Sequence, residues 1–273
     1  MKKIIGFICA SLVGFSAFAY DITEDTKIIG SVKSVTKTVY SISSKFGEYY
    51  RTPSVKFLTN FDASGRQLES LELTPRDAVV NKVQNTYDAY GNLLEKSAYD
   101  PEGVLLWKSV STYDGTKKKE TTEYSKDGSM RNKIIYSYDD NSVDETFYDS
   151  EGVLVRKIVY YYGVNGLLEK EMEYFGDGTL DTVVAYEYGE TGKISKIITT
   201  TQGSTTLMDV FYYTKDGLSE VATYDSSNVL ITRKIVKCDA SGNIIKVTTY
   251  SVGNKFGKTM NEMTEMVEFS YQY

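Results

Sequence analysis

A Tyr-x-x-x-Gly spacing recurs along the chain, and this repeat constrains the fold more than any other feature. The turns form two interleaved series. In the series from Gly65 to Gly242, successive turn residues are 24 to 26 residues apart, and the turns of the second series have the same spacing. The eight to ten residues between turns are rich in Val, Ile, Thr and Tyr, which is typical of β-strands. The residues expected at repeat turns are Tyr87, Gly91, Tyr99, Gly103, Tyr148, Gly152, Tyr162, Gly166, Tyr174, Gly178, Tyr188, Gly192, Tyr213 and Gly217.

The connecting sequence Asp-x-x-Gly predicts tight hairpin loops. Aspartate can accept hydrogen bonds from its own backbone, and glycine adopts the positive φ that closes such a turn. Short turns make neighbouring strands antiparallel. We therefore expect an all-β chain, an antiparallel meander of tandem two-strand repeats of about 25 residues each, forming an extended or rolled sheet. A closed β-barrel, which would remove the sheet edges, is the alternative.

The N-terminus has the pattern of a secretory signal peptide. Two lysines precede an apolar run from Ile4 to Phe18, which ends in Ala-Phe-Ala. We divide the chain into a signal peptide (1–19), an N-terminal β cap (20–60), the hairpin repeats (61–254) and a C-terminal strand (255–273). Pro53 falls outside the expected turns and suggests an edge or a break, because proline cannot donate to a ladder.

Composition excludes several kinds of chemistry. The 273 residues contain no histidine, which removes histidine-based catalysis and metal binding. The net charge is −6, and removal of Lys2 and Lys3 with the signal would make it about −8. This charge argues against nucleic acid and against anionic membrane surfaces as main partners. Only Cys238 would remain of the two cysteines, so no intramolecular disulfide is expected.

Several residues could carry chemistry, but each has a structural explanation that fits the repeat better. The tyrosines could stack on sugars or on a partner protein, yet packing beside the turns would also explain them. Cys238 occupies a tyrosine position of the repeat, which favours a packed thiol over a reactive one. Trp107 is expected in the core. Two groups of acids could carry chemistry: Asp139, Asp140, Asp144 and Glu145 could bind calcium, and Glu169 with Glu171 could hydrolyse glycosides. The first group lacks the spacing of a known calcium loop and the second is only one of many such pairs, so we assign no catalytic, cofactor-binding or metal-binding residue.

The phrases Tyr-Asp-x-x-Gly-Asn-Leu at 87–93 and Tyr-Asp-x-x-Gly-Val-Leu at 99–105 and 148–154 resemble YD repeats of the RHS type. The chain is also similar to short secreted bacterial hairpin-repeat proteins of unknown function, over about residues 30–250. This resemblance implies β architecture and export, and it brings no catalytic residues.

The uniform repeat predicts an exported, non-enzymatic scaffold or binding module at the cell surface or in the periplasm, with an unknown protein or glycan partner and no cofactor. An outer-membrane β-barrel is the alternative, because Val267, Phe269, Tyr271 and Tyr273 alternate with polar residues up to the C-terminus. A lipid-facing stripe should be apolar at mid-strand, and Lys119, Lys157 and Lys196 interrupt it. A secreted carbohydrate-active protein is the third hypothesis.

Overall fold

The computed structural model describes residues 22–23, 28–255 and 257–273, so the expected signal peptide lies outside the described residues. Within these described residues, eighteen antiparallel strands form one sheet. No helix in the described ranges is long and apolar enough to cross a membrane. The strands are β1 (Ser34–Lys45), β2 (Glu48–Phe61), β3 (Gln67–Leu73), β4 (Val79–Tyr87), β5 (Leu93–Tyr99), β6 (Leu105–Asp114), β7 (Lys117–Ser125), β8 (Met130–Tyr138), β9 (Ser142–Asp149), β10 (Leu154–Tyr162), β11 (Leu168–Phe175), β12 (Leu180–Tyr188), β13 (Ile194–Thr201), β14 (Ser204–Thr214), β15 (Gly217–Asp225), β16 (Leu230–Cys238), β17 (Ile244–Lys255) and β18 (Lys258–Gln272).

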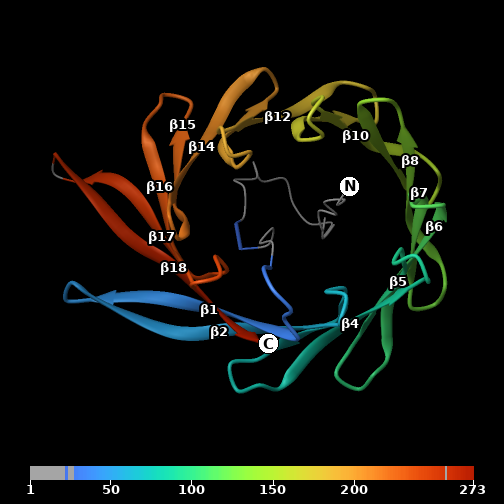
Figure 1. Ribbon diagram of the computed structural model, residues 1–273, viewed down its shortest axis with the longest axis horizontal. Coiled ribbons are helices and arrows are strands. Elements are labelled where there is room, and N and C mark those ends of the chain that lie inside the picture. Colours follow the sequence, from blue (N-terminus) through green and yellow to red (C-terminus); the bar gives the residue numbers. More distant parts are fainter. Residues whose placement is uncertain (1–21, 24–27, 256) are drawn as a thin grey trace.

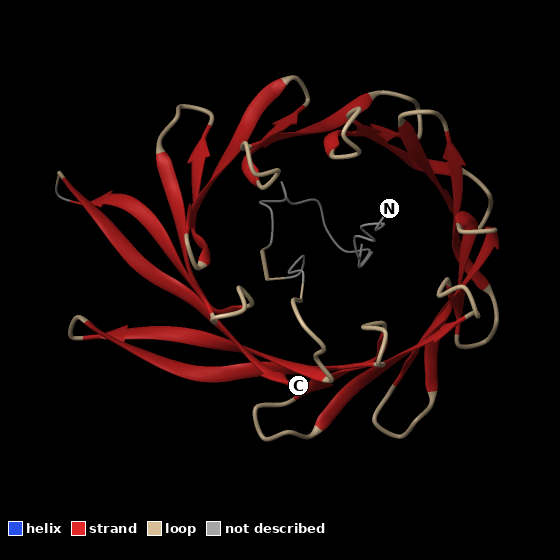
Figure 2. Cartoon of the chain, in the orientation of Figure 1, coloured by secondary structure: helices blue, strands red, loops and turns tan. Residues whose placement is uncertain are grey.

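The sheet closes into a barrel (Figures 1 and 2). Each strand pairs with the next one along the chain, and the first strand pairs with the last, from Ser34 opposite Gln272 to Ser41 opposite Glu265. The predicted all-β antiparallel meander is confirmed, and the closed barrel is correct in place of the extended sheet. Residues 20–60, expected as a cap, supply β1 and β2, which are two strands of the ring.

The turns follow the predicted chemistry. In the first repeat turn, Asp62 Oδ1 accepts hydrogen bonds from the backbone N–H groups of Ser64 and Arg66, while Gly65 has a φ of 77°. The same left-handed conformation occurs at the turn glycines Gly91, Gly103, Gly152, Gly166, Gly178 and Gly192, with φ between 72° and 84°.

A register shift beside the turn tyrosines explains why the sheet curls. The pairing slips between Thr86 and Tyr87, between Thr112 and Tyr113, and at the corresponding place in most hairpins. An extra residue on one strand is a β-bulge, which increases the local twist and bends the strand. Pro53 lies at another bulge, because Val39 pairs with Val55 while Tyr40 pairs with Pro53.

The two interleaved series of turns form the two rims of the barrel. Turns that follow even-numbered strands, such as those at Gly91 and Gly166, lie at the rim where the chain enters β1 and leaves β18; we call it the terminal rim. Turns that follow odd-numbered strands, such as those at Gly103 and Gly178, lie at the opposite rim. Two long hairpins, β1–β2 and β17–β18, project there as fingers (Figure 1), so we call it the finger rim.

The inner face of the wall can be identified from the N-terminal segment. Ile22 is 3% exposed and packs in one cluster with Ile197, Phe211 and Val221. The described residues before β1 lie within the ring in Figure 1. Because side chains alternate along a strand and paired residues share a face, this cluster fixes which residues of every strand point inward.

The turn carboxylates predict how stability depends on pH. The backbone N–H of Arg66 lowers the pKa of Asp62, and that of Thr179 lowers the pKa of Asp177. A carboxyl group whose pKa is lower in the folded state stabilises the fold above its unfolded pKa and loses this contribution on acidification. We expect the thermal unfolding midpoint to fall as the pH drops below about 3.8. The variant Asp62→Asn/Asp177→Asn should show a shallower fall, and an unchanged pH profile would contradict the assignment.

Candidate functional site

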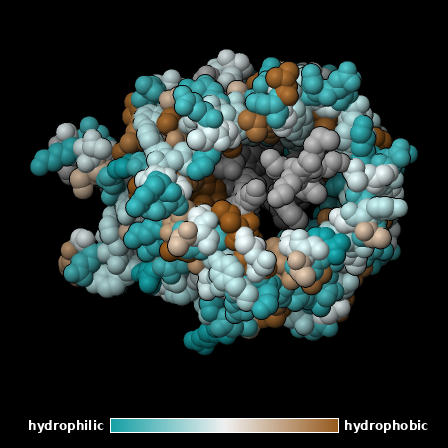
Figure 3. All heavy atoms as spheres, viewed as in Figure 1, coloured by the Kyte–Doolittle hydropathy of each residue, from teal (hydrophilic) through white to brown (hydrophobic). Residues whose placement is uncertain are grey.

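The inner wall is divided into an apolar arc and a polar arc. The apolar arc spans β13 to β17 and centres on Ile197, Phe211, Val221, Val236 and Val247, each at most 7% exposed. Ile22 covers it from inside the ring. Figure 3 shows hydrophobic residues beside the central hollow, while the outer rim is mostly hydrophilic.

The polar arc spans β7 to β12 and gathers tyrosines around two carboxylates. Glu145 pairs with Tyr136 on one side and with Ile158 on the other. Burial raises the pKa of Glu145, and the Lys118 ammonium opposes this rise. Burial lowers the pKa of Lys118, while Glu145 opposes that change. The two side chains therefore lie close enough on the inner wall for each to favour the charged form of the other.

The second carboxylate of the polar arc is Glu171. Its Oε1 accepts a hydrogen bond of 2.7 Å from the Tyr186 hydroxyl. Glu171 pairs with Tyr160 on β10, so Tyr160 lies between the two acids. Burial, followed by the charge of Glu145, raises the pKa of Tyr160, which therefore stays protonated and able to donate. This arrangement can bind a polar ligand through hydroxyl groups, carboxylates and aromatic faces.

The tyrosines of the terminal rim point inward, and several of them tie their hairpin to the preceding one. Tyr87 donates its hydroxyl to the Gln67 carbonyl, Tyr113 to Leu93 and Tyr188 to Leu168, always across 20 residues. In the same position Cys238 Sγ lies 3.5 Å from the Leu218 carbonyl, which it approaches as a weak donor. These tyrosines therefore have a structural task, in addition to lining the lumen.

Removing these hydroxyls should weaken the barrel without opening it. We expect Tyr113→Phe and Tyr188→Phe each to lower the free energy of unfolding by about 1 kcal/mol, because each leaves a carbonyl without its donor. The double variant should show the sum, since the sites share no partner. Urea denaturation would measure these changes. Tyr90→Phe is the control, because Tyr90 is 83% exposed in a turn; an equal loss there would exclude the hydrogen bonds as the cause.

The tyrosines of the finger rim point outward instead. Tyr99 pairs with Lys82, Tyr124 with Lys108 and Tyr148 with Lys133, and the Lys82 ammonium lies 5.3 Å from the centre of the Tyr99 ring. The predicted series of turn tyrosines thus splits into an inner set and an outer set. The sequence motif is the same at both rims, and only the direction of the strand decides the face.

Ion pairs between neighbouring strands cover the outer wall near the strand middles. They occur around the ring, with separations of 2.7–3.8 Å, so the wall is charged along its circumference. The pairs are Lys108–Glu95, Lys133–Glu120, Lys157–Asp144, Lys196–Glu187, Arg233–Glu220 and Lys246–Glu268.

The acidic residues considered from the sequence do not form a metal site. Asp144 points outward and pairs with Lys157 at 2.7 Å, whereas Glu145 points inward. Asp139 and Asp140 lie in the turn between β8 and β9. Among the described residues no group of three or more acids or cysteines could hold a metal ion. The alternation of the strand therefore separates residues that are adjacent in the sequence.

The other candidate residues lie on the inner wall. Glu169 and Glu171 share the inner face of β11. Trp107 pairs with the inward-facing Ala98, and the Lys96 ammonium lies 5.9 Å from its ring centre. Cys238 packs against the apolar arc, and burial raises the pKa of its thiol. The inward tyrosines Tyr136, Tyr160 and Tyr186 precede the turn motif by two residues, and sequence reasoning missed them because it treated only the turn tyrosines as a series.

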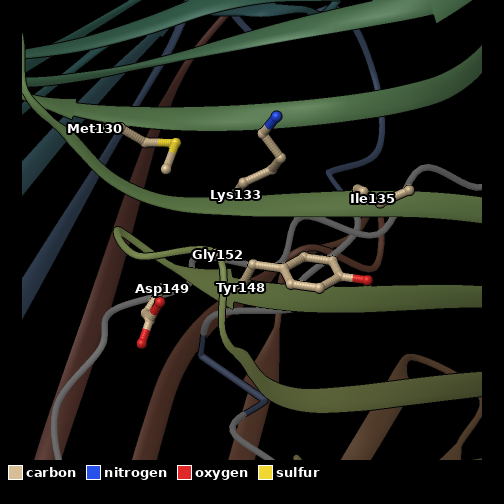
Figure 4. A pocket seen from close by; sticks show the side chains of 6 residues that line it. All are labelled: Met130, Lys133, Ile135, Tyr148, Asp149 and Gly152. Atoms are coloured by element: carbon tan, nitrogen blue, oxygen red, sulfur yellow. The ribbon is translucent and has the colours of Figure 1, made fainter.

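A hollow of about 210 Å³ lies on the outer side between β8 and β9 (Figure 4). Met130, Lys133, Ile135 and Tyr148 line it, with Asp149 and Gly152 of the following turn. It is smaller than usual ligand pockets, and Lys133 already pairs with Glu120. The inner wall is therefore the stronger candidate site.

No protein-family model matches the chain, and no curated protein matches it. Among solved structures, the chain is similar to a porin-like protein from Bacteroides uniformis, with a TM-score of 0.50 at 10% identity over 90% of this chain and 99% of that one. The Tc holotoxin pore of Photorhabdus luminescens matches with a TM-score of 0.16 at 11% identity, over 76% of this chain and 20% of that one. A Bacteroides fragilis protein of unknown function matches with a TM-score of 0.12 at 11% identity, over 70% and 91%. The TM-scores of the last two matches are too low to carry an argument, so the YD-repeat resemblance rests on the turn motif alone. The first match shows that the chain shares the β-barrel fold of the porin-like protein.

Proposed function

We propose that the chain is an exported, non-enzymatic β-barrel of the bacterial envelope that works at the outer membrane. The observation that carries this proposal is the closed ring of eighteen strands, together with its likeness to a porin-like barrel along nearly the whole of both chains. The signal-like N-terminus supports export.

The outer wall bears on how such a barrel would meet the membrane. A spanning barrel needs an apolar band about 25 Å tall, and a lysine or arginine at its middle costs about 2–4 kcal/mol. Here cations such as Lys133, Lys157 and Arg233 lie near strand middles. The C-terminal alternation does not supply a lipid-facing stripe either, because Phe269 packs against the apolar arc inside the barrel. These features favour contact with the membrane surface over insertion of the whole wall.

Fractionation of a bacterium that has an outer membrane and expresses the full chain tests the proposal. We expect the protein in the envelope fraction, released by an alkaline carbonate wash. Release by detergent but not by carbonate would indicate a barrel that spans the outer membrane, which also agrees with an outer-membrane protein. Retention in the cytoplasm, with the N-terminus uncleaved, would overturn the proposal.

A carbohydrate-binding barrel is the second candidate, favoured by the polar arc. Tyrosine faces, Trp107 and the carboxylates Glu145 and Glu171 are groups that stack on and hydrogen-bond to sugars. Calorimetric titration with a panel of oligosaccharides should detect binding that Tyr160→Phe weakens. An absence of heat with every sugar would remove this candidate.

A further inference from the structure

The two fingers extend the barrel wall beyond the finger rim. β1 and β18 pair only as far as Ser41 and Glu265, and from there each hairpin continues with its own partner. The four strands of these hairpins have 12 to 15 residues, whereas the other strands have 7 to 11. Figures 1 and 2 show both fingers projecting from the same side of the ring. Their tips are therefore free to meet a surface that the barrel itself does not touch.

The connections of both fingers share the sequence Lys-Phe-Gly. The first tip reads Lys45-Phe46-Gly47 and the second reads Lys255-Phe256-Gly257. Phe46 has an exposed fraction of 105%, the highest value for a large hydrophobic residue together with Val164. Position 256 lies outside the described residues, so its identity comes from the sequence alone.

Folding alone does not explain a phenylalanine at this position. Phe46 has a φ of 54° and is followed by Gly47 at 82°, a two-residue turn for which Asn-Gly is the favoured sequence. A residue with a bulky side chain pays about 1–2 kcal/mol in the left-handed conformation. Local strain at an exposed aromatic residue indicates a role outside the fold.

The fingers also carry a charge opposite to that of the chain. Residues 45–48 and 255–258 contain Lys45, Lys255 and Lys258 against Glu48, while the whole chain has 31 basic and 37 acidic residues. The flanks add Tyr49, Tyr50 and Met260, each 43–49% exposed. Aromatic side chains beside lysines are typical of segments that enter the headgroup region of a membrane.

A contact joins the two fingers near their tips. The Tyr49 hydroxyl of the first finger accepts a hydrogen bond of 3.3 Å from the Met263 N–H of the second and lies 3.5 Å from the Asn261 carbonyl. The two tips stand apart in Figure 1, and two separate contacts from one barrel with the same surface strengthen attachment.

We propose that the two fingers are a docking device for an anionic lipid bilayer, with Phe46 entering the headgroup region and the lysines contacting lipid phosphates. This deepens the proposed function, since it supplies the membrane contact that the charged wall does not. The net negative charge of the chain argues against binding to such a surface. Salt screens charges beyond about 10 Å, however, so the lysines at the tips act on the lipid phosphates while the more distant acids of the barrel do not.

Sedimentation with lipid vesicles tests the docking device on protein recovered from the host envelope. We expect binding to vesicles of phosphatidylethanolamine with phosphatidylglycerol and weaker binding to phosphatidylcholine alone. The variant Phe46→Asn should lower the partition coefficient about tenfold, because its aromatic side chain no longer leaves water. Its thermal unfolding midpoint should be equal or higher, since Asn-Gly suits the turn.

The control removes exposed apolar side chains from the opposite rim. Tyr90→Ser/Val164→Ser should leave vesicle binding unchanged, although these residues are 83% and 105% exposed. Vesicle binding by the fingertip variant equal to that of the wild-type protein would overturn the docking device. If protein recovered from the envelope binds no vesicles, the docking device is wrong but the proposed envelope location stands. If the protein stays in the cytoplasm, the proposed envelope location is itself wrong. If the wild-type protein binds no vesicles but self-associates, and the fingertip variant loses this self-association, the tips bind a second copy of the chain and the lipid proposal is overturned.

Discussion

Replacing Asn243 with alanine is expected to lower the free energy of unfolding by about 3 kcal/mol. The Asn243 side chain is completely buried and joins three parts of the chain at the terminal rim. It accepts a hydrogen bond of 2.6 Å from the Ile29 N–H and donates one of 3.0 Å to the Ile29 carbonyl. It also lies 3.3 Å from the Tyr273 hydroxyl. Alanine would leave these groups without their partner, so the loss exceeds that of an ordinary turn substitution.

The matched control for Asn243 is Asn92, which follows the turn glycine of another repeat in the same sequence context. Asn92 donates to Asp88 at 2.8 Å in a part-buried bond and to the Gly115 carbonyl at 2.9 Å in an exposed one. We expect Asn92→Ala to cost about 1 kcal/mol, because water can replace these bonds. Urea denaturation would measure both variants, and equal losses would show that the burial of Asn243 does not matter.

Replacing Gly176 with alanine is expected to destabilise the barrel by about 3 kcal/mol. A Cβ atom at this position would lie 2.1 Å from the Leu154 carbonyl oxygen and 3.2 Å from that of Val155. Both oxygens belong to the backbone of β10, which cannot move aside without breaking its ladder. The turn between β11 and β12 would have to shift away from its neighbour, and thermal unfolding would report the change.

Gly189 is the control for Gly176. It also lies in a turn without a positive φ, but the nearest atom to an added Cβ is the Lys193 carbonyl oxygen at 3.9 Å. Gly189→Ala should be neutral or stabilising by a few tenths of a kcal/mol, because alanine restricts the unfolded chain. If Gly176→Ala behaved in the same way, the close approach of this turn to β10 would be wrong.

The turns and the strands could be predicted from the sequence because they depend on local geometry. Asp62 and Gly65 need only their own backbone to close a hairpin, and the residues between turns favour extended conformations. The aromatic residue before each turn could also be expected to have a structural task. Its hydrogen bond to a carbonyl 20 residues earlier, as for Tyr113 and Leu93, depends on the register between strands and could not be read from the motif.

Three features of the inner wall needed the closed structure. Phe269 belongs to an alternation that suggested a lipid-facing strand, yet it packs inside the barrel. Glu145 and Asp144 are adjacent in the sequence and lie on opposite faces. Lys118 and Glu145 are 27 residues apart and come together only because β7 to β9 curve around one side of the lumen.

The sequence by itself determined that this chain is an antiparallel meander with a turn about every twelve residues, because each hairpin is specified by its own aspartate and glycine. Only the tertiary structure decided that the meander closes, that one set of tyrosines faces the lumen and the other faces outward, and that the first and last hairpins become fingers. Closure joins Ser34 to Gln272 and depends on the twist accumulated over all the bulged hairpins, which no single repeat contains.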